Sequence, residues 1–500
     1  MRSKELSAAW KSYLCVAILA LVTACANFPA VHPAQKDADA SGERSSGSEI
    51  LGDQFSVLSS PVSQDLLEIH GLVVSGGSLV ALASTAESRA RTVLRSDDGG
   101  VNWTQAESIP DIADLTSSSY VTVSLMAAGN WLVAVRSGER TDSVLSPEQS
   151  VAISSDAGST WRLVDLPVPD GALPVVSSAT EVDGRLVLGG TTQTVRDGDD
   201  PGRAQAYDAA LWVNADTATQ FERLATATFD GIAFNQQILQ LVLFDGQLIA
   251  IGTDSTSDPN YPPPPVVAWA STDGGQSWAQ MAGLLGPGGF HEDLRPALVI
   301  GDSLVLRFAE SQMALASGSN TWLDRPHDGY SSHADELALP DGGTAVTWTD
   351  REACEQGCSI GYAGRIQDET VQPTRLDSIA DCAHPALEED PEDPQVEPHA
   401  PGLIGDQVTA LVACGWGAGL AFSGDGGESW TTAQLYESGA DGEMLSVIRC
   451  YDPQDFYGAA YVYLPDQDAL VALMMVSSTF TTSQDGGISG RIVALRISSP

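Results

Sequence analysis

Residues 96–103 read SDDGGVNW, and three later stretches follow the same pattern: SSDAGSTW at 154–161, STDGGQSW at 271–278 and SGDGGESW at 423–430. Between two strands, an aspartate carboxylate accepts hydrogen bonds from turn amides, a glycine adopts a positive φ, and a tryptophan packs beneath the hairpin. The pattern therefore predicts four structural turns. The shared residues are Ser96, Asp98, Gly100 and Trp103; Ser154, Asp156, Gly158 and Trp161; Ser271, Asp273, Gly275 and Trp278; and Ser423, Asp425, Gly427 and Trp430.

The spacing of these turns indicates a repeat architecture. Trp103 and Trp161 are 58 residues apart, and Trp161 and Trp278 are 117 apart, which leaves room for a missing copy. We expect weak copies at 214–221 (NADTATQF) and 315–322 (LASGSNTW), and one more eroded unit at 358–376. Each unit holds four short apolar, β-branched runs separated by turn signals, which is typical of a propeller blade.

The expected fold is an all-β propeller of four-stranded antiparallel blades. We count eight blades, with seven as the alternative if the short fifth unit or the eroded sixth is an insertion. The last unit supplies only three strand-like runs, and SQDGG at 483–487 is expected to be a loop. Residues 55–59 (FSVLS) are therefore expected to pair with residues 491–497, because closing the ring removes open sheet edges.

The amino terminus has the pattern of an export signal. A basic segment, MRSKELSAAWK, precedes the apolar run YLCVAILALV, which is too short to span a membrane stably. Val22, Thr23, Ala24 and Cys25 resemble the lipobox of bacterial lipoproteins, which implies cleavage before Cys25 and lipid attachment to its sulfur. We expect a signal peptide at 1–24, a flexible stalk at 25–52 and one propeller domain at 53–500, tethered outside the cytoplasmic membrane.

The four turns resemble the Asp-box, or BNR repeat, of sialidase-like β-propellers. In that family the box caps the turn between the third and fourth strands of a blade, away from the face that usually binds ligands. The resemblance implies that the boxes here are scaffolding. The opposite face should then carry the long loops at 137–149, 191–208, 254–265 and 381–401.

A sialidase-like hydrolase would need an arginine triad that binds a carboxylate, a tyrosine nucleophile with a nearby glutamate, and an aspartate that acts as the catalytic acid. The first unit reads EIHGLVVSGG and lacks the family's arginine at that place, while LRPALV at 294–299 resembles that motif in the wrong unit. The weak candidates for such a site are Arg295, Arg351, Arg449 and Tyr451.

Two further sets of residues have possible binding or cross-linking roles. Asp197, Asp199 and Asp200 offer hard oxygen ligands suited to Ca²⁺, as does the acidic run LEEDPED at 387–393, although neither matches an EF-hand loop. Export permits disulfides, and the exported body has five cysteines. We expect Cys354 to pair with Cys358, and Cys382 with Cys414 or Cys450.

The charge narrows the choice of partners. The chain has 66 acidic and 24 basic residues, a net charge of −42, which disfavours nucleic acid and anionic lipid surfaces. The leading hypothesis is a lipid-anchored, non-catalytic propeller that binds an extracellular protein or glycan. The alternative is an exo-acting glycoside hydrolase of the sialidase superfamily.

Overall fold

A computed structural model divides the chain into two compact units, Met1–Ser45 and Ser46–Pro500. The residues that the structure describes all lie in the second unit, from Phe55 to Pro500 with gaps. Outside it lie residues 1–54, 64–65, 86–90, 107, 111–120, 139–149, 195–205, 215–219, 225–235, 255–264, 285–293, 295, 309–310, 326–333, 351–359, 368–369, 377–395, 415–416, 436–458 and 477–490. The predicted signal peptide and stalk therefore lie outside the described residues, as does SQDGG at 483–487.

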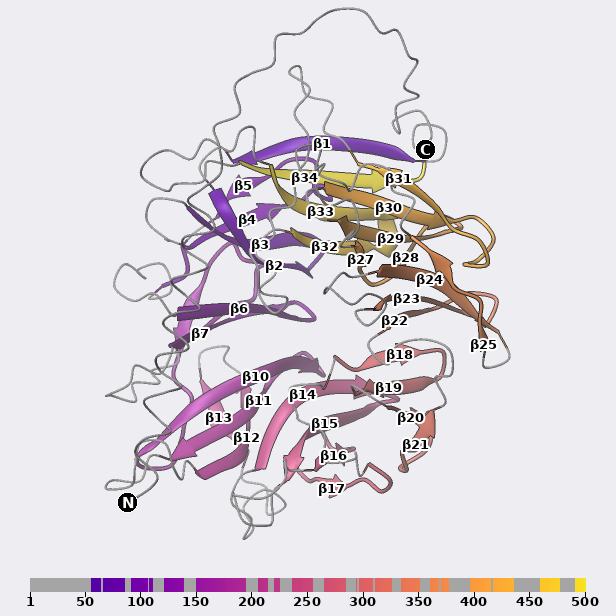
Figure 1. Ribbon diagram of the computed structural model, residues 1–500. Helices are drawn as coiled ribbons and strands as arrows, with labels where there is room; N and C mark the ends of the chain where they lie inside the picture. Colours follow the sequence, from indigo (N-terminus) through magenta and orange to yellow (C-terminus); the bar gives the residue numbers. More distant parts are fainter. Residues whose placement is uncertain are drawn as a thin grey trace, which may run out of the picture. The chain divides into compact units, whose positions relative to one another are not determined.

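The described strands form eight antiparallel sheets, which are the blades of a propeller ring (Figure 1). This confirms the all-β class and the count of eight, and the seven-bladed alternative is wrong. Blades 1 to 4 consist of β2 (Leu66–Ser75), β3 (Ser78–Thr85), β4 (Arg91–Ser96) and β5 (Thr104–Gln105); β6 (Val121–Ala128), β7 (Trp131–Gly138), β8 (Ser150–Ser154) and β9 (Arg162–Val164); β10 (Ala172–Val182), β11 (Arg185–Thr194), β12 (Ala206–Asn214) and β13 (Phe221–Arg223); and β14 (Gln236–Phe244), β15 (Gln247–Asp254), β16 (Val266–Ser271) and β17 (Ala279–Gln280).

The second half of the ring repeats this plan with small additions. Blades 6 and 7 each carry one extra short strand, and a single 3₁₀ turn, η2 (Pro465–Gln467), joins two strands of blade 8. Blades 5 to 8 consist of β18 (Leu298–Ile300), β19 (Ser303–Arg307), β20 (Gln312–Ala316) and β21 (Leu323–Arg325); β22 (Asp335–Ala338), β23 (Thr344–Asp350), β24 (Ile360–Gln367), β25 (Thr370–Val371) and β26 (Thr374–Arg375); β27 (Val396–Pro398), β28 (Gly402–Ile404), β29 (Gln407–Cys414), β30 (Gly417–Ser423) and β31 (Thr431–Gln434); and β32 (Ala459–Leu464), β33 (Ala469–Val476), β34 (Arg491–Ser498) and β1 (Ser56–Ser63).

The middle strands of the blades are apolar on both faces because each blade is covered by a neighbour on either side. In β7, Leu132, Val133, Ala134 and Val135 are all buried although successive side chains point to opposite faces. This explains why these strands read as continuous apolar runs. The weak repeats predicted at 214–221, 315–322 and 358–376 contribute to blades 3, 5 and 6.

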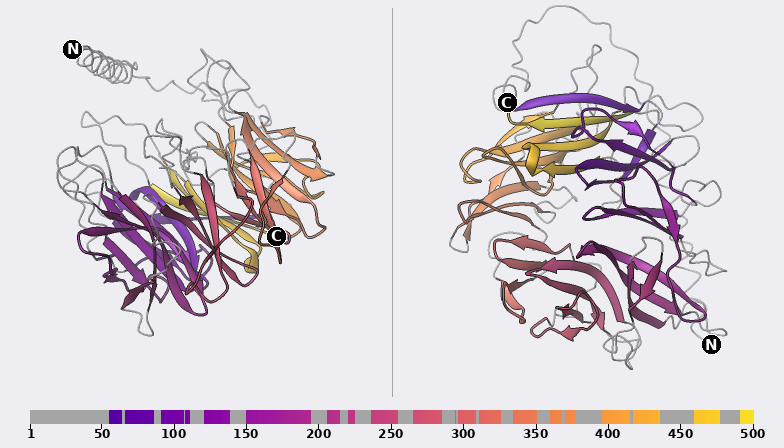
Figure 2. Two further views of the ribbon diagram at one scale, coloured as in Figure 1. Left: turned by 90° about the horizontal axis from the view of Figure 1, so that it is seen from below. Right: turned by 180° about the vertical axis from the view of Figure 1, so that it is seen from behind.

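The ring is closed by pairing its two ends, as the sequence predicts. β1 runs antiparallel to β34 from Ser56 opposite Ser498 to Ser63 opposite Ile492, and so becomes the outermost strand of blade 8. Just before β1, the buried Phe55 ring meets Phe422 of blade 7 edge-on, with centroids 5.3 Å apart. Both views in Figure 2 show the indigo strand beside the yellow ones.

The two faces of the ring carry different connections. Because the chain reverses at every strand, the first-to-second and third-to-fourth turns share one face, here called the lower face. The second-to-third connections and the links between blades share the opposite, upper face. The long loops expected on the upper face fall mainly in residues 139–149, 195–205, 255–264 and 377–395, outside the described part of the chain.

Deleting residues 55–63 should destabilise the whole ring, because it unpairs β34 and removes the Phe55 contact. We expect the free energy of unfolding, measured by urea titration, to fall by at least about 3 kcal/mol, the typical loss for a buried phenylalanine. Leu58→Thr is the control, since Leu58 is exposed on β1 and its replacement should cost under about 0.5 kcal/mol. A deletion variant with the urea midpoint of the intact protein would contradict this role of β1.

Candidate functional site

The four complete boxes lie on the lower face. Each forms the turn between the third and fourth strands of its blade, joining β4 to β5, β8 to β9, β16 to β17 and β30 to β31. These are blades 1, 2, 4 and 7.

All four boxes form the same hydrogen bonds. In the second box, Ser154 Oγ donates to Asp156 Oδ1 (2.8 Å) and accepts from the amide of Gly158 (2.9 Å). Asp156 Oδ1 also accepts from the amide of Thr160 (2.9 Å), and Trp161 Nε1 donates to the carbonyl of Gly158 (3.1 Å). The other three boxes repeat these four bonds within about 0.2 Å.

The glycine of the box is required by backbone geometry and by close packing. Gly100 has a φ of 92°, and a Cβ at this position would lie 2.8 Å from Val471 of blade 8. Any other residue would be strained and would push the neighbouring blade away. The box glycine therefore sets how closely two blades approach.

The structure adds one position that the sequence pattern missed. The residue before each tryptophan donates its side chain to the second carboxylate oxygen of the box aspartate, at 2.5 to 2.7 Å. The four residues are Asn102, Thr160, Ser277 and Ser429. All four side chains are hydrogen-bond donors, so the sequence pattern already contained this position.

These bonds hold the box carboxylates ionised. Hydrogen bonds from the Ser277 side chain and amide, and from Ser271, lower the pKa of Asp273 to about 2. Burial raises the pKa of Asp425, but hydrogen bonds from Ser429 and Ser423 outweigh it and lower this pKa to about 2 as well. Burial also raises the pKa values of Asp98 and Asp156, but the hydrogen bonds of the box, led by those from Asn102 and Thr160, outweigh it and lower both. Each ionised carboxylate therefore serves as the acceptor of the hydrogen bonds that hold its turn.

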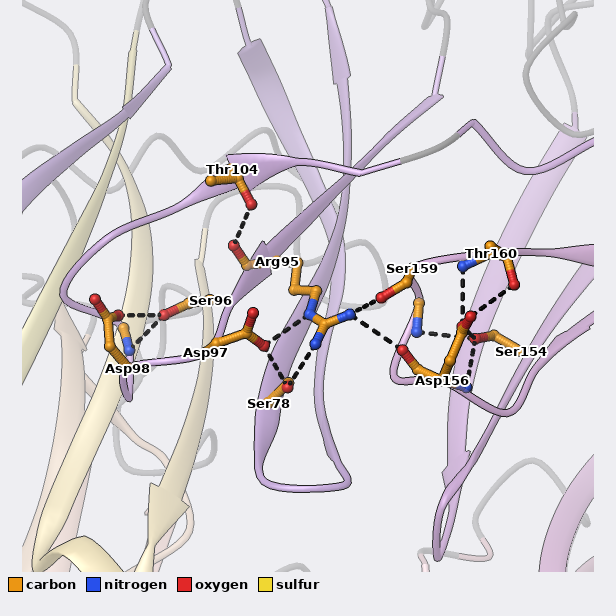
Figure 3. A network of polar contacts seen from close by, with 12 residues as sticks. Ser78, Arg95, Ser96, Asp97, Asp98, Thr104, Ser154, Asp156, Ser159 and Thr160 are labelled. Carbon is orange, nitrogen blue, oxygen red and sulfur yellow. Dashed lines mark hydrogen bonds and ion pairs between the residues drawn. The ribbon is translucent and has the colours of Figure 1, made fainter.

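Arginines tie three of the boxes to the preceding blade. Arg95 of blade 1 donates Nη1 to the carbonyl of Asp156 (3.1 Å) and to Ser159 Oγ in the second box, while Asp97 and Ser78 orient its guanidinium (Figure 3). Arg496 of blade 8 reaches the carbonyl of Gly99 (2.8 Å) in the first box. Arg365 of blade 6 reaches that of Gly426 (3.3 Å) in the fourth.

The three arginines occupy equivalent places in their blades. Arg95 pairs with Val80, Arg496 with Val471 and Arg365 with Ala345, each between the second and third strands. The partner of each arginine also lies against the box glycine of the following blade. A Cβ built at that glycine would contact Val80, Val471 or Ala345, respectively. The corresponding place before the third box holds the buried Val213, and Leu224 packs near Gly275 instead.

On the upper face, five polar residues join blades 5 and 6, and we call them the upper-face cluster: Arg307, Gln312, Arg325, Asp335 and Glu336. Arg307 Nη1 donates to Asp335 Oδ1 (2.7 Å) and to the carbonyl of Ala334. Arg325 Nη1 donates to both carboxylate oxygens of Glu336 (2.9 and 2.7 Å). Both arginines are thus paired with carboxylates inside the protein.

A second group on this side of the ring is aromatic. The rings of His399 and Tyr461 lie 5.0 Å apart, and Tyr461 Oη accepts from the amide of Ala400 (2.9 Å). Burial, with the nearby charge of Asp335, raises the pKa of Tyr461 to about 12. Burial likewise raises the pKa of Tyr463. These phenols stay protonated at neutral pH and act as hydrogen-bonding groups.

A histidine and a serine meet in blade 1. His70 Nε2 lies 2.9 Å from Ser84 Oγ, where a β-bulge interrupts the pairing of β2 with β3. Burial, reinforced by the Arg91 charge, lowers the pKa of His70 to about 3. The imidazole is therefore neutral, and because Ser84 is buried the pair is not open to a substrate.

Most of the site residues expected from the sequence fall outside the described part of the chain. This applies to Arg295, Arg351, Arg449, Tyr451, Asp197, Asp199, Asp200, Cys25, Cys354, Cys358, Cys382 and Cys450. Only the backbone of Cys414, in β29, is described, so these sites and pairings stay predictions. Among the described residues, no group of three or more His, Cys, Asp or Glu side chains is placed to hold a metal, and no helix is long and apolar enough to cross a membrane.

Comparison with known proteins shows similarity of fold at low identity. No protein-family model and no curated protein sequence matches the chain significantly. A Trypanosoma rangeli sialidase mutant displaying trans-sialidase activity shares 13% identity over 86% of this chain and 54% of its own, with a TM-score of 0.36. The polysaccharide lyase Uly1 shares 8% identity over 89% and 99%, with a TM-score of 0.41.

A structure from a study of two prolyl endopeptidases is also similar, at 9% identity over 82% of this chain and 54% of its own, with a TM-score of 0.43. The chain spans about half the length of the sialidase and of this peptidase. The similarity to sialidase propellers and other propellers concerns the fold and carries no information on activity.

Trp161→Ala should lower stability, because Trp161 is buried in the apolar cluster between blades 1 and 2. We expect the free energy of unfolding to fall by about 3–5 kcal/mol in a urea titration. Leu163→Ala is the control, since Leu163 is two residues away but 41% exposed. If Trp161→Ala unfolds at the same urea concentration as Leu163→Ala, the box does not have this structural role.

The box carboxylates should also give stability a defined pH dependence. The pKa of Asp425 falls from its ordinary 3.8 to about 2 on folding, so its contribution is complete above about pH 4 and is lost as the pH falls towards 2. Asp425→Asn cannot titrate, and its melting temperature should lie below that of the unmodified protein by a margin that shrinks from pH 5 to pH 2. Asp466→Asn, an exposed aspartate outside the boxes, should show a small difference throughout. A constant margin for Asp425→Asn would contradict the assignment.

Proposed function

We propose that this protein is an Asp-box propeller and a bacterial lipoprotein, held outside the cytoplasmic membrane, that binds a protein or glycan through its upper face without catalysis. The proposal rests on the difference between the two faces of the ring. On the lower face, the box side chains are consumed by hydrogen bonds within their own turns. The longest connections of the chain start from strands that end at the upper face, and long connections commonly carry recognition.

The chemistry of the described upper-face residues supports recognition over hydrolysis. Arg307 and Arg325 are bound to Asp335 and Glu336, so their charges are already compensated. Gripping a substrate carboxylate would take Arg325 from Glu336 and leave that carboxylate buried without its counter-charge, which is costly. The protonated Tyr461 offers a hydrogen bond at neutral pH and no charged nucleophile.

Charge also favours one class of ligand. The net charge of −42 repels anions at long range, and Asp335 presents a partly exposed carboxylate at the upper face. A neutral glycan or a surface carrying basic groups fits these conditions better than an acidic sugar. We therefore propose a neutral or cationic ligand.

The ligand is best identified with a glycan array and a panel of basic peptides, using the full chain in detergent. For any ligand found, we expect Asp335→Asn to weaken binding by about tenfold or more, the scale of a lost charge-assisted hydrogen bond. Asp341→Asn is the matched control, because Asp341 also pairs with an arginine, Arg365, but on the lower face. Weaker binding for Asp341→Asn alone, or release of sugar from arrayed glycosides, would argue against this proposal.

The membrane anchor is tested separately. If Cys25 carries the lipid, Cys25→Ser should move the protein from the membrane fraction to the soluble fraction or leave it with its signal peptide attached. Cys15→Ser is the control, because Cys15 lies within the predicted signal peptide and its loss should not alter fractionation. A processed Cys25→Ser protein that remains in the membrane fraction would refute the lipoprotein assignment.

A further inference from the structure

The interface between blades 5 and 6 differs from the other interfaces of the ring. Seven neighbouring pairs of blades, including the pair that closes the ring, are joined by clusters of buried apolar side chains drawn from both blades. Among the described residues, no such cluster joins blade 5 to blade 6. The apolar residues around Trp348 form a cluster within blade 6 alone.

Polar contacts hold the upper half of this interface. Gln312 Nε2 donates to Glu336 Oε1 (3.0 Å), next to the two bonds from Arg325 to the same carboxylate. Arg307 adds its bonds to Asp335 and Ala334 from the neighbouring strand. The Glu336 side chain is fully buried, so one carboxylate from blade 6 organises two side chains of blade 5.

The lower half of the same face of blade 5 is open. A cavity of about 400 Å³ lies against it, and its lining comes from blade 5 alone. The lining residues include Ser303, Ala314, Ala316 and the largely exposed Leu323, which are mostly small. Blades 5 and 6 are therefore held at the upper end, with open space below.

The two kinds of interface differ in how they respond to separation. Separating two blades that share an apolar cluster exposes apolar surface to water, and the free-energy cost is proportional to the exposed area. Opening is therefore costly at the seven interfaces that have such clusters. A buried ion pair contributes little beyond the cost of drying it, and water readily replaces its partners once the faces part. Among the interfaces as the described residues show them, the one between blades 5 and 6 is therefore expected to open most easily.

We propose that this interface is a gate: the ring opens between blades 5 and 6, and the bonds to Glu336 are the latch that holds it shut. Opening leaves each blade intact, because the strands within a blade and the pairing of β1 with β34 are not involved. The gate gives transient access to the facing surfaces of the two blades from the upper face to the cavity below.

Two adjacent residues of β23 are suited to report on the gate. Val346 lies opposite Glu336 in the pairing of β22 with β23, so it shares the face that meets blade 5. Ala345 points the other way and packs with Val408 of blade 7. Both are fully buried, so any thiol placed at either position is protected until its own interface opens.

The test measures thiol labelling by iodoacetamide in full-length Val346→Cys and Ala345→Cys variants under native conditions, with peptide mass spectrometry to separate these sites from the native cysteines. We expect Val346→Cys to react at least about tenfold faster than Ala345→Cys, because only its interface opens locally. Equal rates at the two positions would mean that labelling follows global unfolding, and would overturn the proposal.

A second substitution tests the latch itself. Adding Glu336→Gln should accelerate labelling of Val346→Cys by a further tenfold or so and leave Ala345→Cys unchanged, since it removes the charge that holds Arg325. Glu181→Gln is the control, because Glu181 accepts a hydrogen bond from Asn130 across the apolar interface between blades 2 and 3. The latch is refuted if Glu336→Gln accelerates both positions equally or neither. If Glu336→Gln does not fold, the comparison of Val346→Cys with Ala345→Cys still decides whether the gate exists.

Discussion

The pairing of β1 with β34 is the constraint on which the rest of the ring depends. Each blade is a sheet with two mainly apolar faces, which it buries against its two neighbours. In an open row the two end blades would each expose a face and a sheet edge. Closure removes both, and Phe55 adds an apolar contact between the amino-terminal strand and blade 7. A segment without any motif thus decides whether eight marginal sheets become one cooperative domain.

Within the closed ring, the boxes set the distance between blades. The internal hydrogen bonds of each box fix a compact turn, and its glycine lets that turn lie against the preceding blade. Three arginines then bind the turn's carbonyls from that blade. Where the arginine is absent, before the third box, valine and leucine fill the same space. A guanidinium and an apolar side chain are therefore interchangeable at this place, since both keep the turn and the neighbouring blade in contact.

The upper face is different because the arginines of its cluster pair with carboxylates of the neighbouring blade. The upper-face cluster compensates its own charges within the protein. In the part of the chain that the structure describes, this cluster joins blades 5 and 6, whereas the other neighbouring blades share apolar clusters. Among the described residues, the interface without a shared apolar cluster therefore lies beside the proposed binding face. A ligand that contacts Asp335 would touch blade 6 next to the latch.

The sequence by itself determined the class of fold and the closing strand, and it favoured eight blades over seven. These follow from local rules: the box is a short turn whose residues contact one another, strands alternate or run apolar, and a missing strand shows as a deficit in the last repeat. It also indicated the box residues, and the donor before each tryptophan was visible in the same stretches. Only the tertiary structure decided which arginines reach a neighbouring blade and which interface, among the described residues, is joined by polar contacts in place of an apolar cluster. Arg95 and Asp156, or Gln312 and Glu336, come together because blades stack face to face. That contact depends on the approach of two sheets, which no spacing along the chain encodes.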